Sequence, residues 1–150
     1  MKSEWTDLLS AFSDEGVEYL IVGALALSRH GVTRATGDLD IWIRASDENA
    51  DRVFRALARF GAPLAGMNPG DLAQPGVVFQ IGVAPLRIDV LTSVTGVEFE
   101  EAWNARQSDR MWEVPVSVIS REHLIRNKRA VGRPQDLLDA DLLEQNKSRT

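Results

Sequence analysis

The residues best suited to chemistry in this sequence are aspartates within two short, otherwise apolar runs. Asp38 and Asp40 are two positions apart in a predicted strand, so their side chains point to the same face. Two neighbouring carboxylates on an apolar strand repel each other and resist desolvation. A divalent cation relieves that cost, and Mg²⁺ prefers one or two carboxylates together with water and phosphate oxygens. The spacing therefore predicts a site for Mg²⁺ or Mn²⁺.

The run from Leu86 to Leu91 contains a further carboxylate, Asp89. If this strand lies beside the Asp38 strand, Asp89 becomes a third ligand and the site can hold two metal ions. Two such ions can activate an attacking hydroxyl and hold a triphosphate for in-line displacement. The three carboxylates therefore predict phosphoryl or nucleotidyl transfer. Two alternatives stay open: Asp89 could only pair with Arg87 on the same strand face, and Asp38 with Asp40 could hold a purely structural cation.

The segment before these aspartates is predicted to be a strand, a glycine turn and a helix. The apolar run Tyr19 to Val22 ends at Gly23, which permits a tight turn, and the helix is expected over Ala24 to His30. A helix N-terminus that follows a strand directly is an anion site by geometry and dipole. By itself the pattern is a simple strand–helix turn, but beside the aspartates it predicts a seat for the triphosphate at Gly23 and Ala24.

A polar loop from Gly31 to Gly37 joins this helix to the Asp38 strand. Arg34 and Thr36 are its candidate nucleotide-binding residues. Arg34 could contact a phosphate, pair with Asp38 or be merely solvated. His30, at the end of the helix, could act as an acid or base, since its ordinary pKa permits the role. A structural histidine is the other interpretation.

The remaining pattern predicts an α/β (α+β) fold with a small mixed β-sheet flanked by helices. Two apolar runs joined by a short Gly-Val-Ala-Pro turn predict a hairpin, and a C-terminal helical pair is expected to close one side of the cleft. At 150 residues the length favours one domain over 1–150. We expect its core over about 18–119 and its C-terminal helices over about 120–145. The other expected helices cover 3–15, 47–60 with Asp47 as cap, and 97–106, and the last strand covers 114–119.

Composition excludes several classes of function. The chain contains no cysteine, which excludes disulfides and thiolate metal centres. No apolar run approaches the roughly 20 residues that span a bilayer, and the acidic N-terminal stretch is unlike a signal peptide. We therefore expect a cytoplasmic protein without a membrane partner.

The net charge of −5 argues against non-specific nucleic-acid binding, which needs a basic surface. Basic residues nevertheless gather in two stretches, which could serve a triphosphate as easily as an RNA end: Arg29, His30 and Arg34, and Arg121, Arg126, Lys128, Arg129 and Arg133.

Taken together, these motifs resemble the nucleotidyltransferase superfamily related to DNA polymerase β. Its pattern is a hydrophobic residue with Gly-Gly or Gly-Ser, then Asp-x-Asp, then a lone acidic residue between hydrophobic ones. The matching segments are Val22-Gly23-Ala24, Asp38-Leu39-Asp40 and Ile88-Asp89-Val90. Within the superfamily, residues 22–42 are most similar to small AbiEii-like proteins, whose C-terminal motif is matched by Lys128, Arg133, Asp136 and Asp139. The resemblance covers roughly residues 18 to 143.

This resemblance implies a metal-dependent enzyme that transfers NMP from an NTP to an acceptor hydroxyl. Lys128 and Arg133 would contact the phosphates, and Asp136 would orient a base or a positive side chain. The implied acceptor is a tRNA or RNA end, a protein or a small molecule. The AbiEii-like likeness adds a toxin–antitoxin or phage-defence setting with a cognate partner.

One departure from the family pattern leaves a second class of function open. Ala24 replaces the second Gly or Ser, so a hydroxyl contact to phosphate is lost while a backbone N–H remains. The alternative is therefore a catalytically idle module of the same fold that binds a nucleotide or a protein partner. Such a module would bind NTP without Mg²⁺-dependent turnover.

Overall fold

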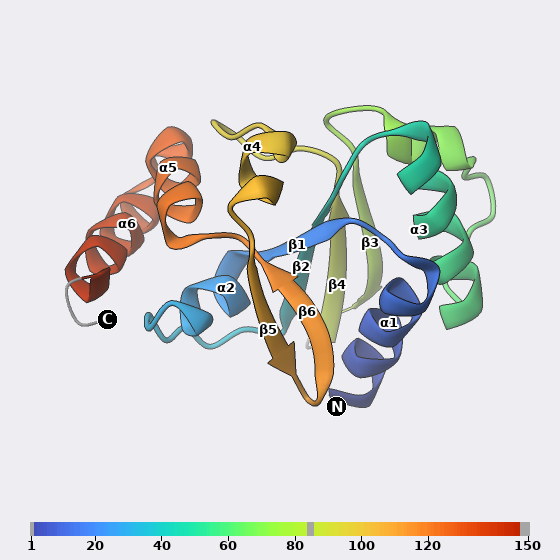
Figure 1. The fold of residues 1–150 in the computed structure, drawn as a ribbon, viewed down its shortest axis with the longest axis horizontal. Coiled ribbons are helices and arrows are strands. Elements are labelled where there is room, and N and C mark those ends of the chain that lie inside the picture. Colours follow the sequence, from blue (N-terminus) through green and yellow to red (C-terminus); the bar gives the residue numbers. More distant parts are fainter. Residues whose placement is uncertain (1, 84–85, 148–150) are drawn as a thin grey trace.

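A six-stranded mixed β-sheet with strand order β3-β4-β2-β1-β6-β5 forms the centre of the protein (Figure 1). The computed structural model describes residues 2–83 and 86–147. Its strands are β1 (Tyr19–Val22), β2 (Asp38–Ile43), β3 (Val78–Val83), β4 (Leu86–Leu91), β5 (Gln107–Met111) and β6 (Val114–Val118). Its helices are α1 (Lys2–Glu15), α2 (Gly23–Arg29), α3 (Asp47–Phe60), the 3₁₀-helix η1 (Pro69–Ala73), α4 (Phe99–Asn104), α5 (Arg121–Val131) and α6 (Pro134–Lys147).

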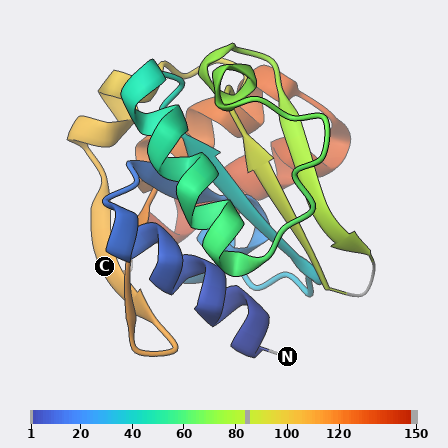
Figure 2. The ribbon, with the colours of Figure 1, turned by 90° about the vertical axis from the view of Figure 1, so that its right-hand side faces the viewer.

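The strand directions place the predicted site strands at the middle of the sheet. β2 runs parallel to β4 and antiparallel to β1, while β3 and β4 form the predicted hairpin. Figure 2 shows α1 and α3 in front of one face of the sheet and α5 behind the other. Leu39 and Ile41 of β2 are completely buried, as alternation with the two aspartates predicts. The predicted mixed sheet flanked by helices is confirmed.

The buried amide of Asn49 fastens α3 to the ends of β1 and β2. Its Oδ1 accepts a hydrogen bond from Glu18 N at 2.8 Å. Its Nδ2 donates to Glu18 O at 2.9 Å and to Arg44 O at 3.0 Å. Because a buried amide without partners would be costly, these bonds fix the helix against the two strands. They also fix the C-terminal end of β2, the strand that carries Asp38 and Asp40.

The helix ends follow from local sequence, with one correction. Ser120 caps α5 by accepting from His123 N, and Gly132 ends it with φ +75°, both as predicted. The cap of α3 is Ser46, which accepts from Asn49 N, and not Asp47. Asp47 is instead the first helical residue, where its negative charge suits the positive helix end.

An additional strand, β5, lies where the sequence pattern indicated none. Its residues are mostly polar and exposed because it is the edge strand of the sheet. It pairs with β6 through a two-residue turn in which Trp112 and Glu113 have φ of 50° and 69°. Two positive φ values are characteristic of a type I′ hairpin turn, which usually contains Asn or Gly. Helix α4 is also shorter than the predicted 97–106.

The C-terminal helices α5 and α6 lie side by side at one end of the molecule, which confirms the predicted pair (Figure 1). Leu124, Ala140 and Leu143 are fully buried between and beneath them. Within residues 2–83 and 86–147, none of the helices has the length and apolar character needed to cross a membrane.

Candidate active site

The parallel pairing of β2 with β4 brings the three aspartates to one face of the sheet. Asp40 is in register with Asp89, and Asp38 is in register with Arg87. Since residues two apart share a face, Asp38, Asp40, Arg87 and Asp89 form one cluster across two neighbouring strands. The prediction that the Asp89 strand lies beside the Asp38 strand is confirmed.

Gly23 provides the space in which the Asp40 carboxylate lies. Its φ is +70°, and a Cβ at this position would lie 2.1 Å from Asp40 Oδ2 and 2.9 Å from Asp40 Cγ. No side chain fits at that distance, so glycine is required both for the turn and for the close approach. The glycine turn after β1 is therefore packed directly against the predicted ligand.

Asp40 is the perturbed carboxyl group of this cluster. Burial raises the pKa of Asp40 to about 6, and the neighbouring charges of Asp89 and Asp38 and a hydrogen bond with Asp89 add to the effect. The guanidinium of Arg87 opposes it only in part. A carboxyl group whose pKa is raised in this way is typical of sites that bind cations or carry out chemistry.

Arg87 contacts two of the three carboxylates. Its Nη2 donates to Asp38 Oδ2 at 3.3 Å, and its Nε lies 3.2 Å from Asp89 Oδ1. The sequence analysis had left open that Asp89 pairs with Arg87 on the same face of β4, and this contact is present. The contact with Asp38 depends on the register between strands, which single-strand periodicity does not reveal.

The donor set of this cluster fits a divalent cation such as Mg²⁺ or Mn²⁺. All three candidate ligands are carboxylates, the buried Asp89 Oδ1 has no hydrogen-bond partner among the described residues, and Asp40 is under strong carboxylate repulsion. Within the described part of the chain, no three His, Asp or Glu side chains are grouped in a geometry ready to hold a metal ion. Joint coordination by Asp38, Asp40 and Asp89 therefore requires side-chain movement from the arrangement in which Arg87 contacts Asp38 and Asp89.

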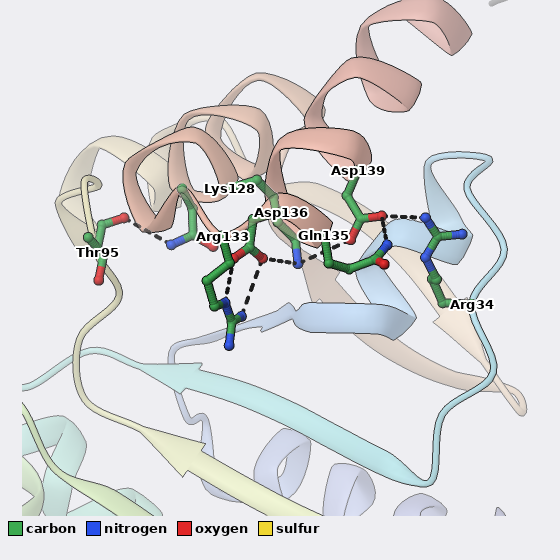
Figure 3. A network of polar contacts seen from close by, with 8 residues as sticks. Arg34, Thr95, Lys128, Arg133, Gln135, Asp136 and Asp139 are labelled. Carbon is green, nitrogen blue, oxygen red and sulfur yellow. Dashed lines mark hydrogen bonds and ion pairs between the residues drawn. The ribbon is translucent and has the colours of Figure 1, made fainter.

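The loop before β2 is tied both to the site and to the C-terminal helices. Thr36 Oγ1 accepts from Asp38 N at 2.9 Å and donates to Asp38 O at 3.2 Å, which shapes the start of β2. Arg34 donates to Asp139 Oδ1 of α6 at 2.5 Å (Figure 3). The partner of Arg34 is therefore Asp139 and not Asp38, whose guanidinium partner is Arg87. Asp139 also accepts from Gln135 Nε2 at 2.9 Å.

The other C-terminal motif residues form one polar network (Figure 3). Asp136, which is 2 % exposed, accepts from Arg133 Nε at 2.6 Å and from Lys128 Nζ at 3.4 Å. The hydrogen bond from Arg133, with the charge of Lys128, lowers the pKa of Asp136. Asp136 thus contacts both Lys128 and Arg133, and the expectation that it orients a base or a positive side chain stays a prediction. The Arg133 side chain remains 74 % exposed, so its guanidinium can still be reached from solvent.

His30 lies away from the carboxylates and has a structural partner. It is buried, and its Nε2 lies 2.7 Å from Ile119 O, to which the ring donates in the matching tautomer. Burial lowers its pKa below the usual value for histidine. This geometry favours the structural interpretation over a role as acid or base.

The helix after Gly23 begins without a capping side chain from the described residues. Its N-cap is Val22, in extended conformation, and the helix spans Gly23–Arg29. No side chain among the described residues therefore caps the amides of its first turn, which include that of Ala24. This agrees with the strand–turn–helix expected from the sequence.

Comparison with solved structures identifies the fold. LnuA, a lincosamide antibiotic adenylyltransferase, aligns at a TM-score of 0.59 and 15 % identity over 96 % of each chain. The antibiotic-resistance factor ANT(2'')-Ia, in complex with adenylyl-2''-tobramycin, aligns at 0.58 and 15 % over 96 % of this chain and 91 % of that one. A candidate nucleotidyltransferase from Thermotoga maritima aligns at 0.58 and 12 % over 97 % and 91 %. No family model and no curated protein sequence matches the chain significantly.

These likenesses show that the chain has the nucleotidyltransferase fold. The likeness extends over almost the whole chain, including the sheet that carries the aspartates and the C-terminal helices. At 12–15 % identity it establishes the architecture, and the site must be argued from this chain's own residues.

Proposed function

We propose that the protein is a metal-dependent nucleotidyltransferase that transfers NMP from an NTP to an acceptor hydroxyl. The observation that carries the proposal is the register that places Asp40 beside Asp89, with Asp38 on the same face and Gly23 beneath Asp40. The adenylyltransferase activity in the name of one fold neighbour, LnuA, supports the same reaction class.

The roles follow from what each group can do. Asp38, Asp40 and Asp89 would hold the divalent cation. When bound, that cation supplies positive charge to the phosphates and lowers the pKa of the acceptor hydroxyl. The backbone amides at Gly23 and Ala24 would donate to the phosphates. Positioning and charge neutralisation then account for most of the catalysis.

The C-terminal helices would complete the phosphate site. Lys128 and Arg133 carry the positive charge, and Asp136 orients both through the contacts already described. Arg34, held by Asp139, brings a further cation to the loop that precedes Asp38. Thr36 acts through the backbone of Asp38, so its contribution is to the position of β2.

The acceptor is proposed on likeness alone. The small-molecule antibiotics in the names of the fold neighbours favour a small hydroxylated acceptor. The AbiEii-like motifs instead favour a tRNA or RNA end or a protein, in a toxin–antitoxin or phage-defence system with a cognate partner. An idle nucleotide-binding module remains the second candidate, because Ala24 lacks the phosphate-binding hydroxyl and Arg87 contacts two of the three carboxylates.

Thermal melting with Mg²⁺ and each NTP tests the nucleotide site without knowledge of the acceptor. An NTP at about 100 times its Kd stabilises the folded state by about 2.7 kcal/mol. For a domain of this size that corresponds to roughly 5–10 °C in Tm. We expect a Mg²⁺-dependent rise for at least one NTP and its loss in Asp38→Ala/Asp40→Ala. No shift with any NTP would contradict the proposal.

Turnover separates the enzyme from the idle module. With α-labelled NTP and candidate acceptors, wild type is expected to transfer label and Asp89→Asn is not. Asp141→Asn is the matched control, since Asp141 is an exposed aspartate on α6 and contacts only Arg129 in the described network. Label transfer retained by Asp89→Asn would rule out the assigned role.

A further inference from the structure

Arg87 lies inside the carboxylate cluster and is assigned no role by the proposed reaction. It is on the same face of β4 as Asp89 and in register with Asp38. Its guanidinium reaches both of these carboxylates, with the Nη2 and Nε contacts of 3.3 and 3.2 Å. One arginine therefore bridges two of the three groups that would hold the cation.

Both contacts are loose for a charged pair. Hydrogen bonds between a guanidinium and a carboxylate are typically about 2.7–2.9 Å long. Arg87 Nε and Asp89 Oδ1 lie within ion-pair distance, yet both are buried and neither has a hydrogen bond among the described residues. By contrast, Arg133 Nε lies 2.6 Å from Asp136 Oδ2. The Arg87 side chain is also 36 % exposed, so a route to solvent is open to it.

The charges explain why a cation and Arg87 would compete. Three ionised carboxylates carry three negative charges, and both the Arg87 guanidinium and a divalent cation would offset part of that charge by contact with the same groups. A cation held by Asp38 and Asp89 would draw on the same two carboxylates whose Oδ2 and Oδ1 atoms face Arg87. Like charges at such short range repel strongly in a partly buried site.

We propose that Arg87 is an internal counter-ion that occupies the carboxylate cluster in the cation-free protein and withdraws when a divalent ion binds. It is a positioning residue, because it keeps Asp38 and Asp89 together in the absence of the ion and lowers the affinity of the site for it. The inference rests on the proposed function, which assigns these carboxylates to a cation.

The test is direct cation binding, measured as the Kd for Mn²⁺ by the electron paramagnetic resonance signal of the unbound ion. Arg87→Gln removes the competing charge and is expected to bind Mn²⁺ at least about tenfold tighter than wild type. Arg87→Lys keeps the charge but loses the planar fork that bridges two carboxylates, so its affinity should lie between the two. If the Gln variant does not fold, the Lys variant alone decides the question.

Arg55→Gln is the matched control. Arg55 lies on α3, pairs with Glu15 and is 57 % exposed, so the same substitution there should leave the Kd for Mn²⁺ unchanged. Melting curves recorded without divalent ions check that each variant is folded.

The outcomes separate the two proposals. Tighter binding by both Arg87 variants supports the counter-ion. Equal or weaker binding by them, with binding by wild type intact, overturns the counter-ion and leaves the nucleotidyltransferase site standing. Absence of Mn²⁺ binding in wild type and all variants, with or without NTP, overturns the metal site of the proposed function and the counter-ion with it.

Discussion

Replacement of Gly23 by alanine is predicted to damage the site through a single methyl group. The new Cβ would lie 2.1 Å from Asp40 Oδ2 and 3.1 Å from Asp40 Cβ, so the whole Asp40 side chain must move. The left-handed backbone at φ +70° adds a conformational cost of about 1–2 kcal/mol. Forcing Asp40 from its rotamer adds about 1 kcal/mol. The expected loss of stability is therefore about 2–3 kcal/mol, with loss of cation and NTP binding.

Gly16→Ala isolates the backbone cost. Gly16 has φ +71°, nearly the same as Gly23, but nothing lies within 4 Å of its Cβ position. Chemical denaturation should therefore show a loss of about 1–2 kcal/mol for Gly16→Ala, and its NTP-dependent rise in Tm should match wild type. The difference between the two glycine variants measures the clash with Asp40.

A double-mutant cycle with Asp40→Ala tests the stated cause. Removing the carboxylate removes the atoms at 2.1 and 2.9 Å, so Gly23→Ala should cost less in that background than in wild type. If Gly23→Ala is no more destabilising than Gly16→Ala and still binds NTP, the close approach of Gly23 to Asp40 does not matter and the reasoning is refuted.

Three further predictions concern Asp40, Asp139 and Glu113. Since the pKa of Asp40 is raised from 3.8 to about 6, the folded protein binds more protons than the unfolded chain between these values. The contribution of Asp40 to stability should thus fall as pH rises from 4 to 6, so the Tm of Asp40→Asn in EDTA should gain on that of wild type over this range. Asp139→Ala removes the carboxylate partner of Arg34 and one of the two carboxylates that contact Lys128, and should cost about 1–3 kcal/mol in urea denaturation. Glu113→Gly relieves φ 69° in the β5–β6 turn and should raise stability by about 1 kcal/mol.

Each of these has a control within the chain. Asp40→Asn is compared with Asp51→Asn, an exposed position on α3, and parallel pH profiles would contradict the assignment. Asp139→Ala is compared with Asp141→Ala, whose side chain is 68 % exposed and should cost at most about 1 kcal/mol. Glu113→Ala keeps the positive φ unfavourable, so a gain equal to that of the Gly variant would argue against backbone strain.

Much of the fold is predictable because its signals are local. The apolar runs of β1, β2 and β4 and the Gly-Val-Ala-Pro turn indicate the strands and the hairpin. Ser120 and Gly132 mark both ends of α5. β5 was not predicted, because an edge strand needs no apolar face. Its turn residues, Trp112 and Glu113, are also not the usual ones at positive φ. Ser46 rather than Asp47 as cap is a one-residue shift of a kind that local patterns do not resolve.

In the candidate site, too, local features were predictable from the sequence and contacts between distant segments were not. The sequence alone determined that Asp38 and Asp40 share a face, that Asp89 lies within an apolar strand, and that Gly23 follows a buried strand, because strand periodicity and glycine chemistry act over a few residues. Only the tertiary structure decided that Asp40 faces Asp89, that Arg87 contacts Asp38, and that Arg34 is held by Asp139 of α6. These contacts depend on strand register and helix packing between distant segments, and no local pattern encodes which partner a charged side chain meets.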